Sequence, residues 1–143
     1  MLDIYHQLTI NAPGRDVFEG IAFPKGLDAW WTKTSNGKPE MGNEYRLDFG
    51  PEYKWKAIVT KCRMYNEFEW NLTQADADWI DTKVGFLLQG ENNFTRVLFY
   101  HLGWPQENDH YKRSNYCWAM YLRILKRYLE FGEFVSYEIR LKV

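Results

Sequence analysis

The sequence has few cysteines and histidines and no long apolar run. Its 143 residues include two cysteines, Cys62 and Cys117, and three histidines. The cysteines lie far apart, and their separation matches no zinc-binding spacing. We interpret both as reduced thiols, because nothing in the sequence indicates secretion into an oxidising compartment.

The chain also lacks an excess of positive or negative charge. The chain has 18 basic and 19 acidic residues and a formal net charge of −1. Nucleic-acid-binding domains usually carry a basic excess, so we expect no nucleic-acid partner. No stretch approaches the roughly 18 apolar residues of a membrane helix. Residues 1–6 also lack the basic and apolar regions of a signal peptide. These absences predict no membrane partner and a cytoplasmic location.

Motifs that would carry chemistry are missing as well. The three histidines show no ligand spacing, so we expect no metal and no cofactor. Asp76, Asp78 and Asp81 suggest a calcium loop, but Asp81 stands where the turn needs Gly, and Leu87 stands where it needs Glu. We therefore interpret these aspartates as a solvated acidic loop. The sequence contains no Gly-x-Ser-x-Gly motif and no phosphate-binding glycine motif.

The sequence does contain segments with clear periodicity. Alternation with period two predicts strands, and the segments that show it are residues 4–10, 44–49, 54–59, 67–72, 82–89 and 94–101. The connections between the later strands are too short for crossover helices, so we expect an antiparallel sheet of about six strands.

Helical spacing appears in three places. Val17, Phe18 and Ile21 predict a short helix after Pro13, and a second apolar helical turn ends at Trp31. A long helix with an apolar stripe ends at Gly132, and residues 134–143 are expected to form an extended tail. This order predicts a single α+β domain over residues 1–143, with an antiparallel sheet and the helices on one face.

Aromatic residues are the most unusual feature, at 18% of the chain with seven tryptophans. The residues that we expect to line a cavity between sheet and helix are Trp30, Trp31, Trp55, Trp70, Phe86, Phe99, His101, Trp104, Trp118, Tyr121 and Tyr128. Ligand pockets combine apolar walls with a few orienting polar groups, which His101 and the tyrosine hydroxyls could supply. The alternative is that these large rings fill the interior completely.

Three segments of the sequence carry a family resemblance. They are Ile10–Pro13 with Val17-Phe18 and Ala29–Trp31, then Thr95–Trp104, and finally Cys117–Leu122 continuing through Leu125–Gly132. On these segments the chain resembles the START-like (SRPBCC, birch-pollen-allergen-like) superfamily. Within it, the chain is most similar to the homologues of the activator of the heat shock protein 90 ATPase, in a single-domain form.

The resemblance implies a helix-grip fold, in which a curved antiparallel sheet wraps around the long C-terminal helix. It also implies a cavity between them that takes apolar molecules. The activators after which the family is named carry a separate N-terminal chaperone-binding domain, for which this chain has no room. The resemblance therefore implies a fold and a pocket, and it does not identify a substrate.

Three functional hypotheses follow. The first is the binding of a small apolar or aromatic ligand as a carrier or sensor, without covalent chemistry. The second is an enzyme of the polyketide-cyclase or hydratase type that uses His101 as acid or base in the same pocket. The third is an interaction module, either a homodimer or a chaperone accessory. An apolar patch formed by Tyr53, Ile58, Leu98 and Tyr100 on the outer sheet face would serve that third function.

Overall fold

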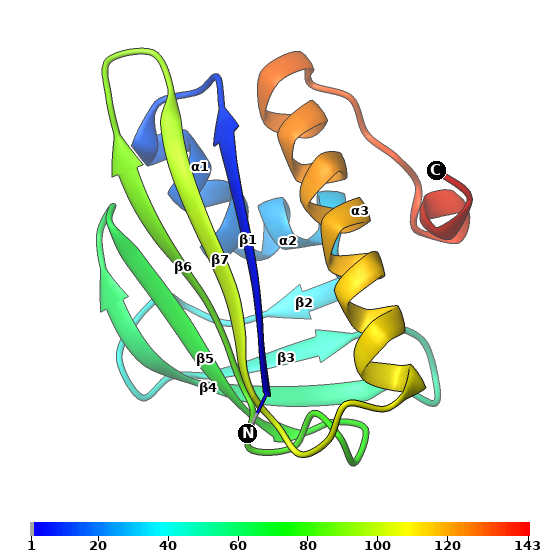
Figure 1. Ribbon diagram of the computed structural model, residues 1–143. Coiled ribbons are helices and arrows are strands. Elements are labelled where there is room, and N and C mark those ends of the chain that lie inside the picture. The colour runs from blue at the N-terminus through cyan, green and yellow to red at the C-terminus, as the bar shows by residue number, and fades with distance from the viewer. Residues whose placement is uncertain (1) are drawn as a thin grey trace.

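The computed structural model describes residues 2–143 (Figure 1). The strands are β1 (Leu2–Ile10), β2 (Thr34–Asn36), β3 (Glu44–Asp48), β4 (Lys54–Arg63), β5 (Glu67–Gln74), β6 (Lys83–Gly90) and β7 (Thr95–Trp104). The helices are α1 (Gly14–Ala22), α2 (Pro24–Trp30), α3 (Asp109–Phe131) and a terminal 3-10 helix, η1 (Tyr137–Lys142). Within this part of the chain, no helix is both long and apolar enough to cross a membrane.

The seven strands form one antiparallel sheet in the order β1-β7-β6-β5-β4-β3-β2. The sheet curves around α3, and α1 and α2 pack inside the same curve (Figure 1). The predicted α+β helix-grip architecture is thereby confirmed. The candidate site lies between α3 and the β3–β4 end of the sheet.

The sheet contains one strand more than the sequence predicts. Residues Thr34–Asn36, which are not among the predicted strands, pair with β3 as the short edge strand β2. Three polar residues show no alternation, so only the pairing with β3 identifies them as a strand. The tail also differs from the expected extended segment, because Tyr137–Lys142 form η1.

The concave face of the sheet has the composition predicted by alternation. Phe68, Trp70 and Leu72 of β5 are fully buried, and so are Phe99 and His101 of β7. On such a half-buried sheet every second residue faces the core, which explains why these positions are large and apolar.

The ends of α3 follow from identifiable capping residues. At the N-terminus, the side-chain oxygen of Asn108 accepts a hydrogen bond from the Tyr111 N–H at 2.9 Å. At the C-terminus, Gly132 adopts φ 68°, and its N–H donates to the Tyr128 carbonyl at 2.9 Å. A left-handed residue after a helix favours glycine, so the predicted end at Gly132 is confirmed.

The convex face holds a buried carboxylate. Alternation predicts that Glu69 faces solvent, but it is only 1% exposed because the Tyr100 ring crosses over Gly85 to reach it. The Tyr100 hydroxyl donates to Glu69 Oε2 at 2.6 Å. A side chain at position 85 would clash with the Tyr100 ring, so glycine is required there. Tyr100 is therefore buried, and the outer apolar patch that we considered does not include it as an exposed residue.

Candidate functional site

The candidate site is a cavity of about 310 Å³ between the N-terminal half of α3, the β3–β4 end of the sheet and the C-terminal segment. Its lining residues are Trp31, Phe49, Trp55, Trp79, His110, Arg113, Ser114, Cys117, Trp118, Tyr121 and Leu141. This volume lies at the small end of the range for ligand pockets, about 300–1,000 Å³. The cavity therefore suits a ligand of one or two rings.

Five aromatic rings form a closed circuit in the cavity wall. The neighbouring centroids are 5.2 Å apart for Trp31–Phe49, 4.9 Å for Phe49–Trp55 and 4.9 Å for Trp55–Trp79. The circuit closes through Trp79–Trp118 at 5.6 Å and Trp118–Trp31 at 5.1 Å. Offset and edge contacts at these distances are favourable, so the rings hold one another in place.

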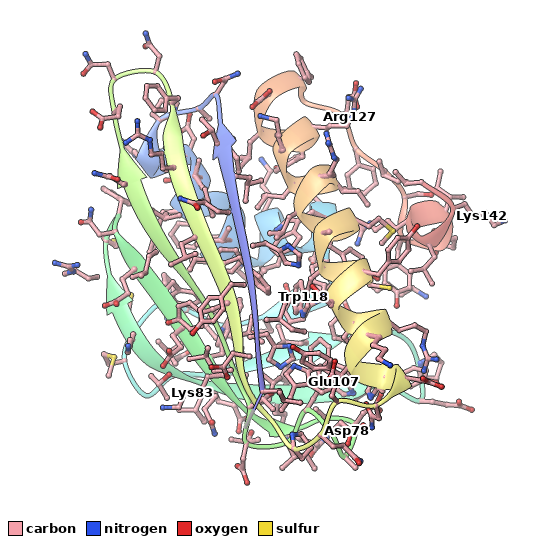
Figure 2. All side chains as sticks on the ribbon, viewed as in Figure 1. Asp78, Lys83, Glu107, Trp118, Arg127 and Lys142 are labelled. Atoms are coloured by element: carbon pink, nitrogen blue, oxygen red, sulfur yellow. The ribbon has the colours of Figure 1, made fainter. Side chains whose placement is uncertain are left out.

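Each ring of the circuit is placed by a different part of the chain. Trp31 caps the C-terminal end of α2, and its N–H donates to the Leu27 carbonyl at 2.9 Å. Phe49 and Trp55 flank the β3–β4 turn. Trp79 lies in the loop between β5 and β6, where its carbonyl accepts a hydrogen bond from the Thr82 hydroxyl at 2.6 Å. Trp118 points from α3 toward the sheet (Figure 2).

His101 lies behind this wall and is fully buried. Its Nδ1 accepts a hydrogen bond from Trp118 Nε1 at 3.1 Å. Its Nε2 lies 2.8 Å from the Thr82 hydroxyl, which itself donates to the Trp79 carbonyl, so Nε2 carries the hydrogen. Burial lowers the pKa of His101 to about 3, and the ring is neutral at physiological pH. Both ring nitrogens are occupied within the protein, and neither faces the cavity.

Polar groups lie along one side of the cavity, on α3. His110 Nδ1 donates to Asp78 Oδ2 at 3.1 Å, and Asn108 Nδ2 donates to the same oxygen at 3.1 Å. These two hydrogen bonds lower the pKa of Asp78, and the hydrogen bond from Asn108 has the larger effect. Burial raises the pKa of the Cys117 thiol, and it raises the pKa of Tyr121 to about 12. Both groups therefore stay protonated at neutral pH.

The C-terminal segment covers one side of the cavity through Leu141. Arg140, which is 1% exposed, holds this segment in place. Its guanidinium donates to the carbonyls of Asp28 at 2.6 Å, Thr32 at 3.0 Å and Val135 at 2.9 Å. In Figure 1 the segment runs back along α3 after the helix ends.

The structure divides the residues that we predicted for the site into three groups. Four of them line the cavity: Trp31, Trp55, Trp118 and Tyr121. Six pack in the core beneath it: Trp30, Trp70, Phe86, Phe99, His101 and Trp104. Tyr128 lines a separate hollow of about 660 Å³ beside α1, which charged residues such as Asp16, Glu19 and Lys25 also line. Although that hollow is larger, the aromatic cavity between sheet and helix better suits an apolar ligand.

The sequence did not identify the other seven lining residues, which are Phe49, Trp79, His110, Arg113, Ser114, Cys117 and Leu141. Trp79 is buried within the loop that we interpreted as solvated, and a lone tryptophan among aspartates was the available signal. Arg113 lies four and eight residues before Cys117 and Tyr121, so helical spacing places all three on one face. Among residues 2–143, no three His, Cys, Asp or Glu side chains gather in a way that could hold a metal ion.

Comparisons with known proteins identify relatives across most of the chain. The sequence profile of a family described as "Activator of Hsp90 ATPase homolog 1-like protein" matches residues 11–130. No curated protein matches the chain.

The chain also resembles several solved structures. The solution structure of the Aha1 dimer from Colwellia psychrerythraea has 28% sequence identity and a TM-score of 0.83, over 93% of this chain and 99% of that one. A protein from Staphylococcus saprophyticus has 17% identity and a TM-score of 0.77, over 94% and 96% of the two chains. DynU16, a protein from the dynemicin biosynthetic locus, has 19% identity and a TM-score of 0.75, over 94% of this chain and 50% of that one.

Proposed function

The chain belongs to the family of activator of Hsp90 ATPase homolog 1-like proteins, and from that premise we propose that it binds a small apolar or aromatic molecule in the cavity beside α3. The observation that supports this proposal is the closed circuit of five rings in the wall of a cavity of about 310 Å³. Such rings are rigid and amphipathic, so they bury a planar ligand with little loss of side-chain entropy.

Binding without covalent chemistry fits these residues better than catalysis by His101. A general acid or base must reach its substrate within hydrogen-bond distance. Both ring nitrogens of His101 are hydrogen-bonded, one to Trp118 and one to Thr82, and His101 is absent from the cavity lining. An enzyme that used His101 would first have to break both of these hydrogen bonds.

The proposal is tested by filling the cavity. Cys117→Phe adds a ring from α3 into the cavity, whereas Ala119→Phe adds the same ring at an exposed position of the same helix. Titration of the wild-type protein with neutral 2-naphthamide should change the fluorescence of the wall tryptophans, with matching heat in calorimetry. Cys117→Phe should weaken binding at least tenfold, and Ala119→Phe should leave it unchanged.

Native mass spectrometry of freshly purified protein supplies an independent test. A co-purifying molecule that is present in the wild type and absent from Cys117→Phe would support the cavity as its site. Equal binding by the wild type and Cys117→Phe would reject the cavity as the site. If the wild type bound no 2-naphthamide and carried no co-purifying molecule, the carrier function would be rejected.

We also propose that the chain forms a homodimer, because the relative from Colwellia psychrerythraea is described as a dimer. The exposed apolar side chains near the C-terminus are a candidate interface; they are Phe131, Phe134, Ile139, Leu141 and Val143, each at least half exposed. Clusters of this kind often mark interaction surfaces. Light scattering of the wild type should give twice the chain mass, and Ile139→Glu should halve it. Tyr5→Glu, at an exposed site on β1, is the control.

A further inference from the structure

Among the described residues, the one Lys, Arg, Asp or Glu side chain in the cavity lining is that of Arg113, a cation. His110 also lines the cavity, and no aspartate or glutamate does. The nearby carboxylate of Asp78 is already engaged by the hydrogen bonds from Asn108 and His110. The first turn of α3 lies on the same side and adds the positive end of its helix dipole.

Arg113 is the one cation of α3 in the cavity lining, and within the described residues it has no partner, as is also true of Lys112 and Arg123 outside the lining. Lys126 pairs with Glu130 at 2.6 Å, and Arg127 pairs with a carboxylate six residues later at 2.6 Å. Asp109 lies four residues before Arg113, which is the usual spacing for a helical ion pair. Even so, among residues 2–143 the Arg113 guanidinium forms no salt bridge and no side-chain hydrogen bond.

Other polar groups of the cavity also supply donors without acceptors. The indole N–H of Trp79, a wall residue, is buried and has no acceptor within the described residues, as is also true of Trp70 and Trp104 in the core. The Tyr121 hydroxyl stays protonated, since burial raises its pKa to about 12. The Arg113 guanidinium and the Tyr121 hydroxyl are thus donors in the lining without an acceptor among residues 2–143, and they favour a ligand that supplies acceptors.

We propose that the ligand is an aromatic carboxylate of one or two rings. Its rings lie against the circuit of Trp31, Phe49, Trp55, Trp79 and Trp118, and its carboxylate pairs with Arg113 at the rim. This inference rests on the proposed function and adds the charge of the ligand to it. Arg113 suits this contact, because guanidinium and carboxylate share a planar, two-hydrogen-bond geometry.

The aromatic circuit alone would also suit a quaternary ammonium ion, which binds to aromatic faces. Sites that select cations gain from a nearby carboxylate, and this cavity has none in its lining. Arg113 would instead repel a cation, at an energy that rises as water is displaced from the site. The charges of the rim therefore favour an anion.

The test compares three probes that share one ring system but differ in charge. The probes are 2-naphthoate, neutral 2-naphthamide and 2-naphthyltrimethylammonium, each titrated into the intact protein by calorimetry and tryptophan fluorescence. The wild type should bind naphthoate about tenfold more tightly than the amide, and the ammonium compound most weakly. Added salt should reduce the preference for naphthoate, because the ion pair at the exposed rim is screened.

Variants of Arg113 separate charge from shape. Arg113→Gln should remove the preference for naphthoate over the amide, and Arg113→Lys should restore part of that preference. Arg123→Gln, at an exposed position of α3 outside the cavity, should behave as wild type.

The possible outcomes distinguish the two proposals. Equal binding of naphthoate and amide, an unchanged preference in Arg113→Gln, or tightest binding of the ammonium compound would overturn the anion inference while supporting the cavity. Absence of binding by all three probes would overturn the proposed function, and the inference with it.

Discussion

Among single residues, His101 acts on the site through Trp118. A neutral imidazole has one donor and one acceptor, and here Thr82 and Trp118 engage both of them. This pairing fixes the indole plane of Trp118, which forms part of the cavity wall. The hydrogen bonds thus explain why a histidine occupies a fully buried position at the centre of an apolar sheet face.

The same burial makes the stability of the protein depend on pH. The pKa of His101 is about 3 in the folded state, against about 6.5 in an unfolded chain. The unfolded state therefore binds the extra proton, and stability is complete above pH 6.5 and falls as the pH drops toward 3. The slope from this one group approaches about 1.4 kcal/mol per pH unit.

Urea unfolding at pH 7, 6, 5 and 4 checks this prediction. His101→Gln retains a donor and an acceptor but does not titrate, so its free energy of unfolding should fall less steeply than that of the wild type. His6→Gln removes the half-buried histidine of β1 and serves as the control for the loss of an imidazole. Parallel curves for His101→Gln and wild type would mean that His101 is not held neutral by the fold.

Among the elements, η1 depends on one buried arginine. The carbonyls of Asp28 and Thr32 lie at the C-terminal end of α2, where helix carbonyls lack partners within the helix. The Arg140 guanidinium supplies those donors and a charge that suits the negative end of the helix dipole. The Tyr137 hydroxyl adds a hydrogen bond to the Phe49 carbonyl at 2.8 Å, next to the cavity.

Arg140→Met should therefore release the C-terminal segment while keeping an apolar stem. We expect a loss of about 2–4 kcal/mol in the free energy of unfolding, because charged hydrogen bonds contribute about 1.5–3 kcal/mol each and their loss leaves buried carbonyls unpaired. Hydrogen exchange should quicken in residues 134–143 and at the end of α2. Lys142→Met, an exposed cation of η1, is the control. Unchanged exchange in the tail of Arg140→Met would show that apolar contacts alone hold it.

The elements that the sequence predicts well are those whose local pattern agrees with their packing. Strand β5 alternates because one of its faces is buried, and α3 has both a continuous apolar stripe and a terminal Gly132. β2 and η1 lack such patterns. β2 forms because it pairs with the edge of β3. η1 is held because Arg140 donates a hydrogen bond to the carbonyl of Asp28, which is distant in the sequence.

The sequence predicts that the candidate site is an aromatic-lined cavity, but it identifies only some of the lining residues. Alternation along a strand identifies the aromatic rings that face the concave side of the sheet. It does not separate Trp70, which packs in the core, from Trp55, which borders the cavity. That difference depends on how deep each strand position lies under α3. Trp79 and Leu141 reach the cavity from a loop and from the tail, whose paths are set by tertiary contacts.

For the whole molecule, the important feature is that no single element contains the site. The walls come from the end of α2, the β3–β4 turn, the β5–β6 loop, α3 and η1. These segments span residues 31 to 141 and meet only in the folded chain. A ligand that fits the cavity therefore binds the folded state and has no comparable site in the unfolded one.

This arrangement predicts that bound ligand stabilises the entire fold against unfolding. At a hundredfold excess over the dissociation constant, 2-naphthoate should raise the free energy of unfolding by about 2.7 kcal/mol. The slowest amides, expected in β5 and β7, should then exchange about a hundredfold more slowly, since they open only by global unfolding. Cys117→Phe should show no such change. Protection limited to α3 and residues 134–143 would instead show that the ligand binds to the helix and tail alone, without the sheet wall that Trp55 and Trp79 provide.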